Sequence, residues 1–158
     1  TLASMLFKNL GIEGATRKEQ LAGFKEKGLF LTDTIKCIFY KNRRPSIPTS
    51  LIQHSARNIL EREIALIDPE YICGMGNTAL SALRCMDRFR PILKSIGRIT
   101  EIPMGDRGSE SGDPHLILIP FPNQRNQGRP AARERMDAGF RRLREIIHGE
   151  CPDAGEDP

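Results

Sequence analysis

The chain has 158 residues, of which 39% are hydrophobic and 28% are charged, and its formal net charge is +4 at pH 7. This length suits one domain with a single core, and the composition is too apolar for a disordered chain and too highly charged for a membrane protein. Because the net charge is small, it would attract a polyanion only where the basic residues cluster on one surface.

Two short helices are predicted at the start of the chain. Apolar residues recur at helical spacing over residues 2–10, and Gly11 follows where a left-handed residue would end the helix. Thr16 and Glu19 have the spacing of a capping box, in which each side chain accepts a hydrogen bond from the other residue's backbone N–H. Gly28 then closes the second helix.

A strand and a longer helix are predicted next. Residues 29–35 are mostly apolar and indicate a strand, although Asp33 introduces a carboxylate near its end. Ser50 and Gln53 have capping-box spacing and predict the start of the clearest helix, which carries one apolar stripe and ends at 68–69.

The second half of the chain predicts further strands and helices. Residues 71–75 form an apolar strand, a turn follows at 76–77, and alanines and leucines over 79–83 suit a helix. A weaker strand is predicted at 98–102, and residues 115–119 resume the sheet.

The chain ends in a predicted amphipathic helix and a tail. Apolar residues from Ala132 to Ile147 share one helical face, and arginines occupy the other. Such a basic face is usually solvated, and contact with phosphates is the alternative. Residues 149–158 are rich in glycine, proline and acidic side chains and are predicted to form a flexible tail.

The alternation of helices and apolar strands predicts an α/β fold whose mainly parallel sheet is covered on both faces, in a single domain over residues 1–148. Sheets of this kind bind ligands at the carboxyl ends of their strands. Three segments are therefore candidates for a site, namely Asp33, Gly74–Asn77 and Phe121–Asn126.

Each candidate segment has a structural and a functional interpretation. A carboxylate at Asp33 either caps nearby loop amides or accepts hydrogen bonds from the N–H groups of a ligand. The Gly74–Asn77 turn either serves as an ordinary helix start or offers its backbone N–H groups to an anion. The amides and the guanidinium of 123–126 suit base edges and phosphates, but a plain surface loop has the same composition.

Metal sites, disulfides and membrane spans are not indicated. The four cysteines form no C-x-x-C pair, so neither a zinc ribbon nor a disulfide framework is expected, and a reducing cytoplasm is the expected location. The histidines lack metal-ligand spacing and are interpreted as solvated or capping residues. Since no run approaches the roughly 20 apolar residues of a membrane span, no membrane partner is expected.

Taken together, three segments resemble the uracil-DNA glycosylase superfamily, with its iron–sulfur branch the nearest. They are Gly28–Cys37, Leu60–Pro69 and Gly74–Leu80, and the resemblance covers roughly residues 1–126 in order. It implies a three-layer α/β/α sandwich with a mainly parallel, about four-stranded central sheet. It also implies an enzyme that flips a damaged base out of DNA and hydrolyses its N-glycosidic bond.

Several positions depart from the pattern of the superfamily. The asparagine that reads uracil falls on Asp33, which lacks a hydrogen-bond donor, and the histidine that stabilises the departing base falls on Phe121. In the iron–sulfur branch Cys37 would be a ligand, but its partner cysteine falls on Ala56, so no four-cysteine iron–sulfur cluster or other metal cofactor is expected. The first strand of the family, with its water-activating residue, is expected to lie before Thr1.

The resemblance implies roles for seven residues and leaves the catalytic residues unassigned. The expected base-binding residues are Asp33, Phe121 and Asn123, and the expected phosphate-binding or nucleic-acid-binding residues are Gly76, Asn77, Arg125 and Asn126. The expected partner is DNA or a nucleotide. The function expected is glycosylase-like action on a nonstandard base, and the alternative is a non-catalytic module that binds nucleic acid or nucleotide on the same fold.

Overall fold

The computed structural model describes residues 2–36, 40–41, 44–45, 47–97 and 114–149. The chain divides into two compact units. The terminal unit combines residues 1–31 with 122–158, and the central unit spans residues 32–121. Each unit is described by itself, and the single domain expected over 1–148 stays a prediction.

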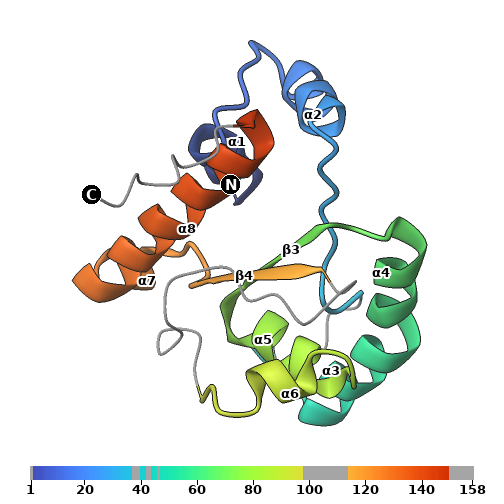
Figure 1. The fold of residues 1–158 in the computed structure, drawn as a ribbon. Helices are drawn as coiled ribbons and strands as arrows, with labels where there is room; N and C mark the ends of the chain where they lie inside the picture. Colours follow the sequence, from blue (N-terminus) through green and yellow to red (C-terminus); the bar gives the residue numbers. More distant parts are fainter. Residues whose placement is uncertain (1, 37–39, 42–43, 46, 98–113, 150–158) are drawn as a thin grey trace, which may run out of the picture. The chain divides into compact units, whose positions relative to one another are not determined.

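The terminal unit is helical in its described residues. Its elements are α1 (Leu2–Asn9), α2 (Arg17–Glu26), α7 (Gln124–Gln127) and α8 (Pro130–His148) (Figure 1). The expected helices at 2–10, after Thr16 and at the C-terminus are thereby confirmed. The Thr16–Glu19 capping box is formed in both directions, and Gly11 has a φ of 66°, as a left-handed helix end requires.

Apolar and polar contacts join the helices of the terminal unit. The rings of Phe7 and Phe24 lie 5.7 Å apart, which packs α1 against α2. At the C-terminal end of α8, one ring nitrogen of His148 lies 3.3 Å from the carbonyl oxygen of Leu10, and the other lies 3.3 Å from the Lys27 ammonium. His148 thus occupies a capping position, which is one of the two roles expected for the histidines.

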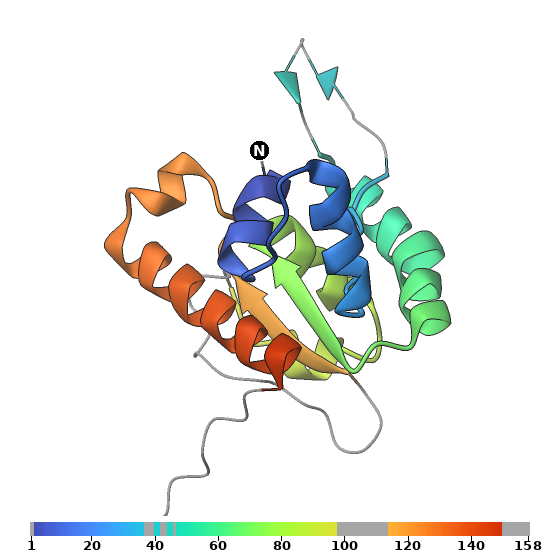
Figure 2. The same cartoon turned by 90° about the horizontal axis from the view of Figure 1, so that it is seen from above.

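The central unit contains both helices and strands. Its elements are β1 (Tyr40–Lys41), β2 (Arg44–Pro45), α3 (Thr49–Ser55), the π-helix η1 (Ala56–Leu60), α4 (Glu61–Ile67), β3 (Tyr71–Met75), α5 (Gly76–Cys85), α6 (Arg90–Leu93) and β4 (His115–Ile119). Strands β1 and β2 pair antiparallel. Strands β3 and β4 lie side by side and run in the same direction (Figure 2). Their register runs from Tyr71 opposite His115 to Met75 opposite Ile119.

The core of the central unit lies between the β3–β4 pair and the helices on one of its faces (Figure 1). Leu80 and Leu83 of α5 are buried there with Leu116 of β4, Phe89 and the inner face of η1 and α4. Gly74 leaves room for the side chain of Leu118 on the neighbouring strand, because a Cβ atom on residue 74 would lie 2.6 Å from Leu118 Cδ2. The predicted strands at 71–75 and 115–119, with the helix between them, are confirmed.

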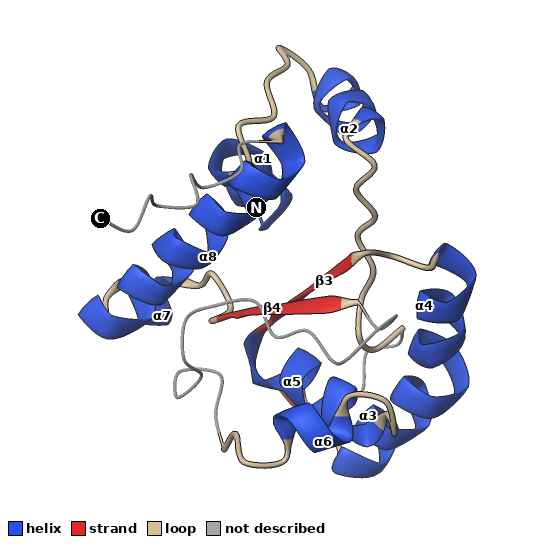
Figure 3. Ribbon diagram, viewed as in Figure 1, coloured by secondary structure: helices blue, strands red, loops and turns tan. Residues whose placement is uncertain are grey.

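The structure corrects the expected strand at 29–35. That segment is a loop (Figure 3), and Phe30 and Leu31 are 62% and 51% exposed. A strand requires a partner edge for its backbone groups, whereas here the Thr34 carbonyl oxygen accepts a hydrogen bond from the Ser55 hydroxyl at 2.5 Å. The Thr34 carbonyl is therefore bonded to a helix side chain and not to the backbone of a neighbouring strand.

The sheet and one helix start also differ from the prediction. Among the described residues the parallel sheet has two strands, not about four, and the strand expected at 98–102 lies outside those residues. The long helix begins at Thr49 with Pro48 as N-cap, so Ser50 is already helical. Because an N-cap side chain needs an extended backbone, the Ser50–Gln53 capping box was a wrong prediction.

Candidate functional site

The carboxyl ends of β3 and β4 bring two predicted segments together. Met75 and Ile119 are the last paired residues, and the chains continue into Gly76 and Phe121. Gly76 has a φ of 83°, and a Cβ atom on it would lie 2.9 Å from the Phe121 Cβ. The Phe121 side chain therefore packs directly over the glycine turn, and it remains 40% exposed.

The turn at Gly76 also starts α5. Met75 is the N-cap residue, and its thioether cannot accept the first helical amides as a serine or aspartate would. The start of α5 therefore lies at the carboxyl edge of the strands and has no side-chain cap. Asn77 lies in this first turn and is exposed.

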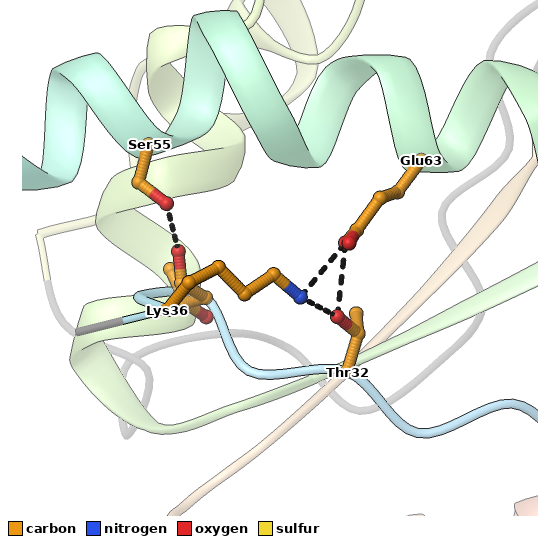
Figure 4. A network of polar contacts seen from close by, with 5 residues as sticks. Thr32, Lys36, Ser55 and Glu63 are labelled. Carbon is orange, nitrogen blue, oxygen red and sulfur yellow. Dashed lines mark hydrogen bonds and ion pairs between the residues drawn. The ribbon is translucent and has the colours of Figure 1, made fainter.

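Asp33 lies on the 32–36 loop of the central unit, and its side chain is exposed. Both neighbours of Asp33 are bonded to the helical stretch formed by α3, η1 and α4 (Figure 4). The Thr32 hydroxyl donates to Glu63 Oε2 at 2.9 Å, and the Ser55 hydroxyl donates to the Thr34 carbonyl. Asp33 is therefore held between two attached residues.

Lys36 completes the network beside Asp33. Its ammonium lies 3.0 Å from Glu63 Oε2 and also donates to the Thr32 hydroxyl (Figure 4). The hydrogen bond from Lys36 lowers the pKa of the Glu63 carboxyl, with a further lowering from Thr32, while desolvation opposes both. Glu63 is thus kept ionised as the shared acceptor of the loop.

The 123–126 segment belongs to the terminal unit and forms the start of α7. Asn123 Oδ1 accepts a hydrogen bond from the Asn126 backbone N–H at 2.8 Å, which makes Asn123 the cap of this short helix. Asn126 is half-buried, and the side chain of Arg125 lies outside what the structure describes. The amide oxygen of Asn123 is therefore already used locally.

A comparison with protein families decides the ancestry of this fold. The model of the Uracil DNA glycosylase superfamily matches residues 1–144, which is most of the chain. The chain belongs to the uracil-DNA glycosylase superfamily. Comparisons with curated proteins and with solved structures gave no match. The family match does not separate the branches of the superfamily, so the nearness to the iron–sulfur branch stays a prediction.

Membership in the uracil-DNA glycosylase superfamily gives the two departures from its pattern a structural setting. Phe121, which is expected at the position of the family histidine, lies two residues after β4 and faces the turn at Gly76. Asp33, which is expected at the position of the family asparagine, lies on a loop and not at the end of a strand. Phe121, Gly76 and Asn77 form one edge, whereas Asn123, Arg125 and Asn126 belong to the other compact unit.

In this superfamily member the described residues offer no cluster for a metal. No group of three His, Cys, Asp or Glu side chains gathers in the part of the chain that the structure describes. Cys73 and Cys85 are free thiols, and Cys37 lies outside the described residues together with Cys151. The lack of an iron–sulfur cluster stays a prediction. No helix among the described residues is long and apolar enough to cross a membrane.

Sequence reasoning missed the residues that hold the Asp33 loop. Ser55, the last residue of α3, is a buried polar residue with 2% of its surface exposed. A serine inside an apolar helical stripe signals a buried hydrogen bond, because an unpaired hydroxyl there would be costly. Glu63 gives no such signal, since acidic residues are common on exposed helix faces.

Proposed function

We propose that this chain binds DNA, takes up a flipped nonstandard base and hydrolyses its N-glycosidic bond. One observation carries the base-binding part: a half-exposed aromatic ring, Phe121, lies over the Gly76 turn at the carboxyl edge of two parallel strands. An aromatic face in that place suits stacking with a base taken out of the helix. Family membership supports DNA as the partner.

Asp33 is proposed to read the edge of the base. An ionised carboxylate only accepts hydrogen bonds, so it suits an edge with N–H donors and repels a carbonyl oxygen such as those that flank the ring N–H of uracil. A site that is built to hydrogen-bond one substrate can reject an analogue by several orders of magnitude when the analogue leaves the polar groups of the site unpaired. The site is therefore proposed to prefer a base other than uracil.

The proposed hydrolysis adds water across the bond between the sugar and the base. The sugar carbon gains the hydroxyl, and the base leaves with the electron pair of the bond and takes up a proton. Phe121 cannot donate a hydrogen bond to the departing base, and one such donor elsewhere is worth about 10²–10³ in rate. The reaction is therefore proposed to be slow or to act on a base that leaves readily.

A non-catalytic module that binds nucleic acid or nucleotide is the second candidate. The observation that favours it is also Phe121, since an aromatic ring retains stacking but cannot stabilise charge. The about four-stranded α/β/α sandwich that the resemblance implies is likewise kept as a proposal, because residues 98–113 lie outside the described part of the chain.

Base release decides between the two candidates. We expect oligonucleotides that carry hypoxanthine or oxidised guanine to lose the base, in single or double strands, and Asp33→Ala to abolish the release. Asp33→Asn is expected to restore discrimination in favour of uracil, because it supplies the missing donor. Asp87→Asn is the matched control, since this aspartate is 88% exposed and lies in the same unit.

The outcomes separate cleanly. Tight, base-dependent binding without release, measured by fluorescence anisotropy, would support the non-catalytic module. If the protein neither releases nor distinguishes any of these bases, both candidates are contradicted.

A further inference from the structure

The residues on both sides of Asp33 are tied to one helical stretch. The Thr32 side chain reaches Glu63 on α4, and the Thr34 backbone reaches Ser55 at the end of α3 (Figure 4). Successive side chains of an extended backbone point to opposite sides. Thr32 is half-buried on the side of the helix, whereas Asp33, the next residue, is exposed.

The π-helix between the two attachment points brings them to one face. Ser55 and Glu63 are eight residues apart, and eight residues of regular α-helix turn about 80° beyond two full turns. A π-turn takes up one extra residue, which brings the two side chains back to within about 20° of each other. The π-helix η1 spans Ala56–Leu60, between these two residues. The π-helix thus places the Ser55 hydroxyl and the Glu63 carboxylate on the same side of the helix, where both contact residues 32–34.

We propose that Ser55 and Glu63 are positioning residues that hold the 32–36 loop and aim the Asp33 carboxylate at the bound base. This inference rests on the proposed function, because it assigns a purpose to the direction of Asp33. Residues 29–36 form no ladder with a strand, so the described attachments of the loop are its bonds to Ser55 and Glu63 and its own Lys36–Thr32 contact. A carboxylate on an untied loop would discriminate poorly, because recognition requires the acceptor to be placed in advance.

Glu63 and Ser55 act on different atoms, which allows each to be tested separately. Ser55 is buried and binds the backbone of the loop, so Ser55→Ala removes one attachment and leaves the Thr34 carbonyl unpaired. Glu63 binds the Thr32 hydroxyl and the Lys36 ammonium, so Glu63→Ala releases two side chains at once. Glu63→Gln keeps an acceptor oxygen, and Glu61→Ala on the same helix is the matched control.

A double-mutant cycle with Asp33→Ala tests the inference. The readout is the ratio of affinities for DNA with and without the preferred base, which a purely structural defect would not change selectively. We expect Glu63→Ala and Ser55→Ala each to lower this ratio roughly tenfold or more, and Glu63→Gln and Glu61→Ala to lower it little. In the Asp33→Ala background the same changes should have almost no effect, because they act through the side chain at position 33.

Hydrogen–deuterium exchange of residues 32–36 provides a readout that does not depend on DNA. Faster exchange of residues 32–36 than in the wild type is expected in Glu63→Ala and Ser55→Ala, with exchange in the core strands Tyr71–Met75 and His115–Ile119 unchanged. Additive effects in the cycle, or unchanged exchange, would overturn the inference while leaving the proposed function intact. A wild-type protein without base discrimination would instead contradict the proposed function, and exchange alone would then decide whether the loop is held. If Ser55→Ala does not fold, Thr32→Val on the half-buried side of the loop tests the other attachment, because it removes the hydrogen bond to Glu63.

Discussion

Gly76 combines two constraints that can be separated experimentally. Its φ of 83° disfavours any side chain, and a Cβ atom would approach the Phe121 Cβ to 2.9 Å. Gly28 has a φ of 70° but nothing within 4 Å of its Cβ position, so it carries the first constraint alone. The two glycines therefore form a matched pair.

Gly76→Ala is expected to destabilise the protein more than Gly28→Ala does. A left-handed alanine costs about 1–2 kcal/mol, and forced overpacking adds about 1–3 kcal/mol. Chemical denaturation of both variants measures the difference in the free energy of unfolding. Equal losses in the two variants would show that Phe121 does not rest on Gly76.

Cys73 is expected to be an unreactive thiol despite retaining some exposed surface. Desolvation raises the pKa of Cys73 from 9.0 to about 12, so the reactive thiolate is about a thousandfold scarcer than in the unfolded chain at neutral pH. The raised pKa also means that stability is retained below about pH 9 and declines as the pH rises toward 12.

Alkylation at pH 8 followed by mass spectrometry checks this prediction. We expect Cys73 to be modified far more slowly than Cys85 in the native protein, and at a similar rate after unfolding. Replacing Cys37 and Cys151 by serine simplifies the analysis. If Cys73 reacts as fast as Cys85 in the native protein, burial does not raise the pKa of the Cys73 thiol.

Among the elements, helices with a complete local signal were predictable from the sequence. The capping box at Thr16 and the apolar face from Ala132 onward depend on residues within one helix, and both form as expected. The segment 29–35 shows the opposite case. Whether an apolar run becomes a strand depends on a partner edge, which lies elsewhere in the chain and cannot be read from the run itself.

The start and the irregular turn of the long helix were not predictable for local reasons. Pro48 has a φ of −62° and a ψ of 144°, the extended conformation of an N-cap residue. The helix therefore begins at Thr49, one residue before Ser50. The π-helix at Ala56–Leu60 has no sequence signal of its own. Its effect is seen only in the folded chain, where it brings Ser55 and Glu63 to the side of the helix that contacts the loop.

The candidate site also has one part that the sequence predicts and one part that it does not. The meeting of Gly76 and Phe121 follows from the rule that parallel strands end at one edge, and the sequence contains that information. The support of Asp33 does not follow from any pattern, because it joins residues about 20 to 30 positions apart through single hydrogen bonds. Asn123 shows a further limit, since capping a short helix and reading a base require the same amide oxygen.

At the scale of the whole molecule, the net charge of +4 becomes informative through its placement. Arg133, Asp137, Arg141 and Arg144 follow one another at the spacing of one face of α8, and all four are exposed. Arg133 lies 3.9 Å from Asp137, which reduces the charge at one end of this face. Arg141 and Arg144 are therefore the best test of contact with phosphates.

Reversing Arg141 and Arg144 to glutamate is expected to weaken DNA binding and to reduce its dependence on salt. Each phosphate contact contributes about 0.9 to the slope of log affinity against log salt, so the loss of two contacts should reduce the slope by about 2. Lys18→Glu with Lys25→Glu is the control, because these exposed lysines on α2 give the same change in net charge. If both double variants change the slope equally, the effect belongs to the total charge of the molecule, and the arginine face of α8 is ordinary solvated surface.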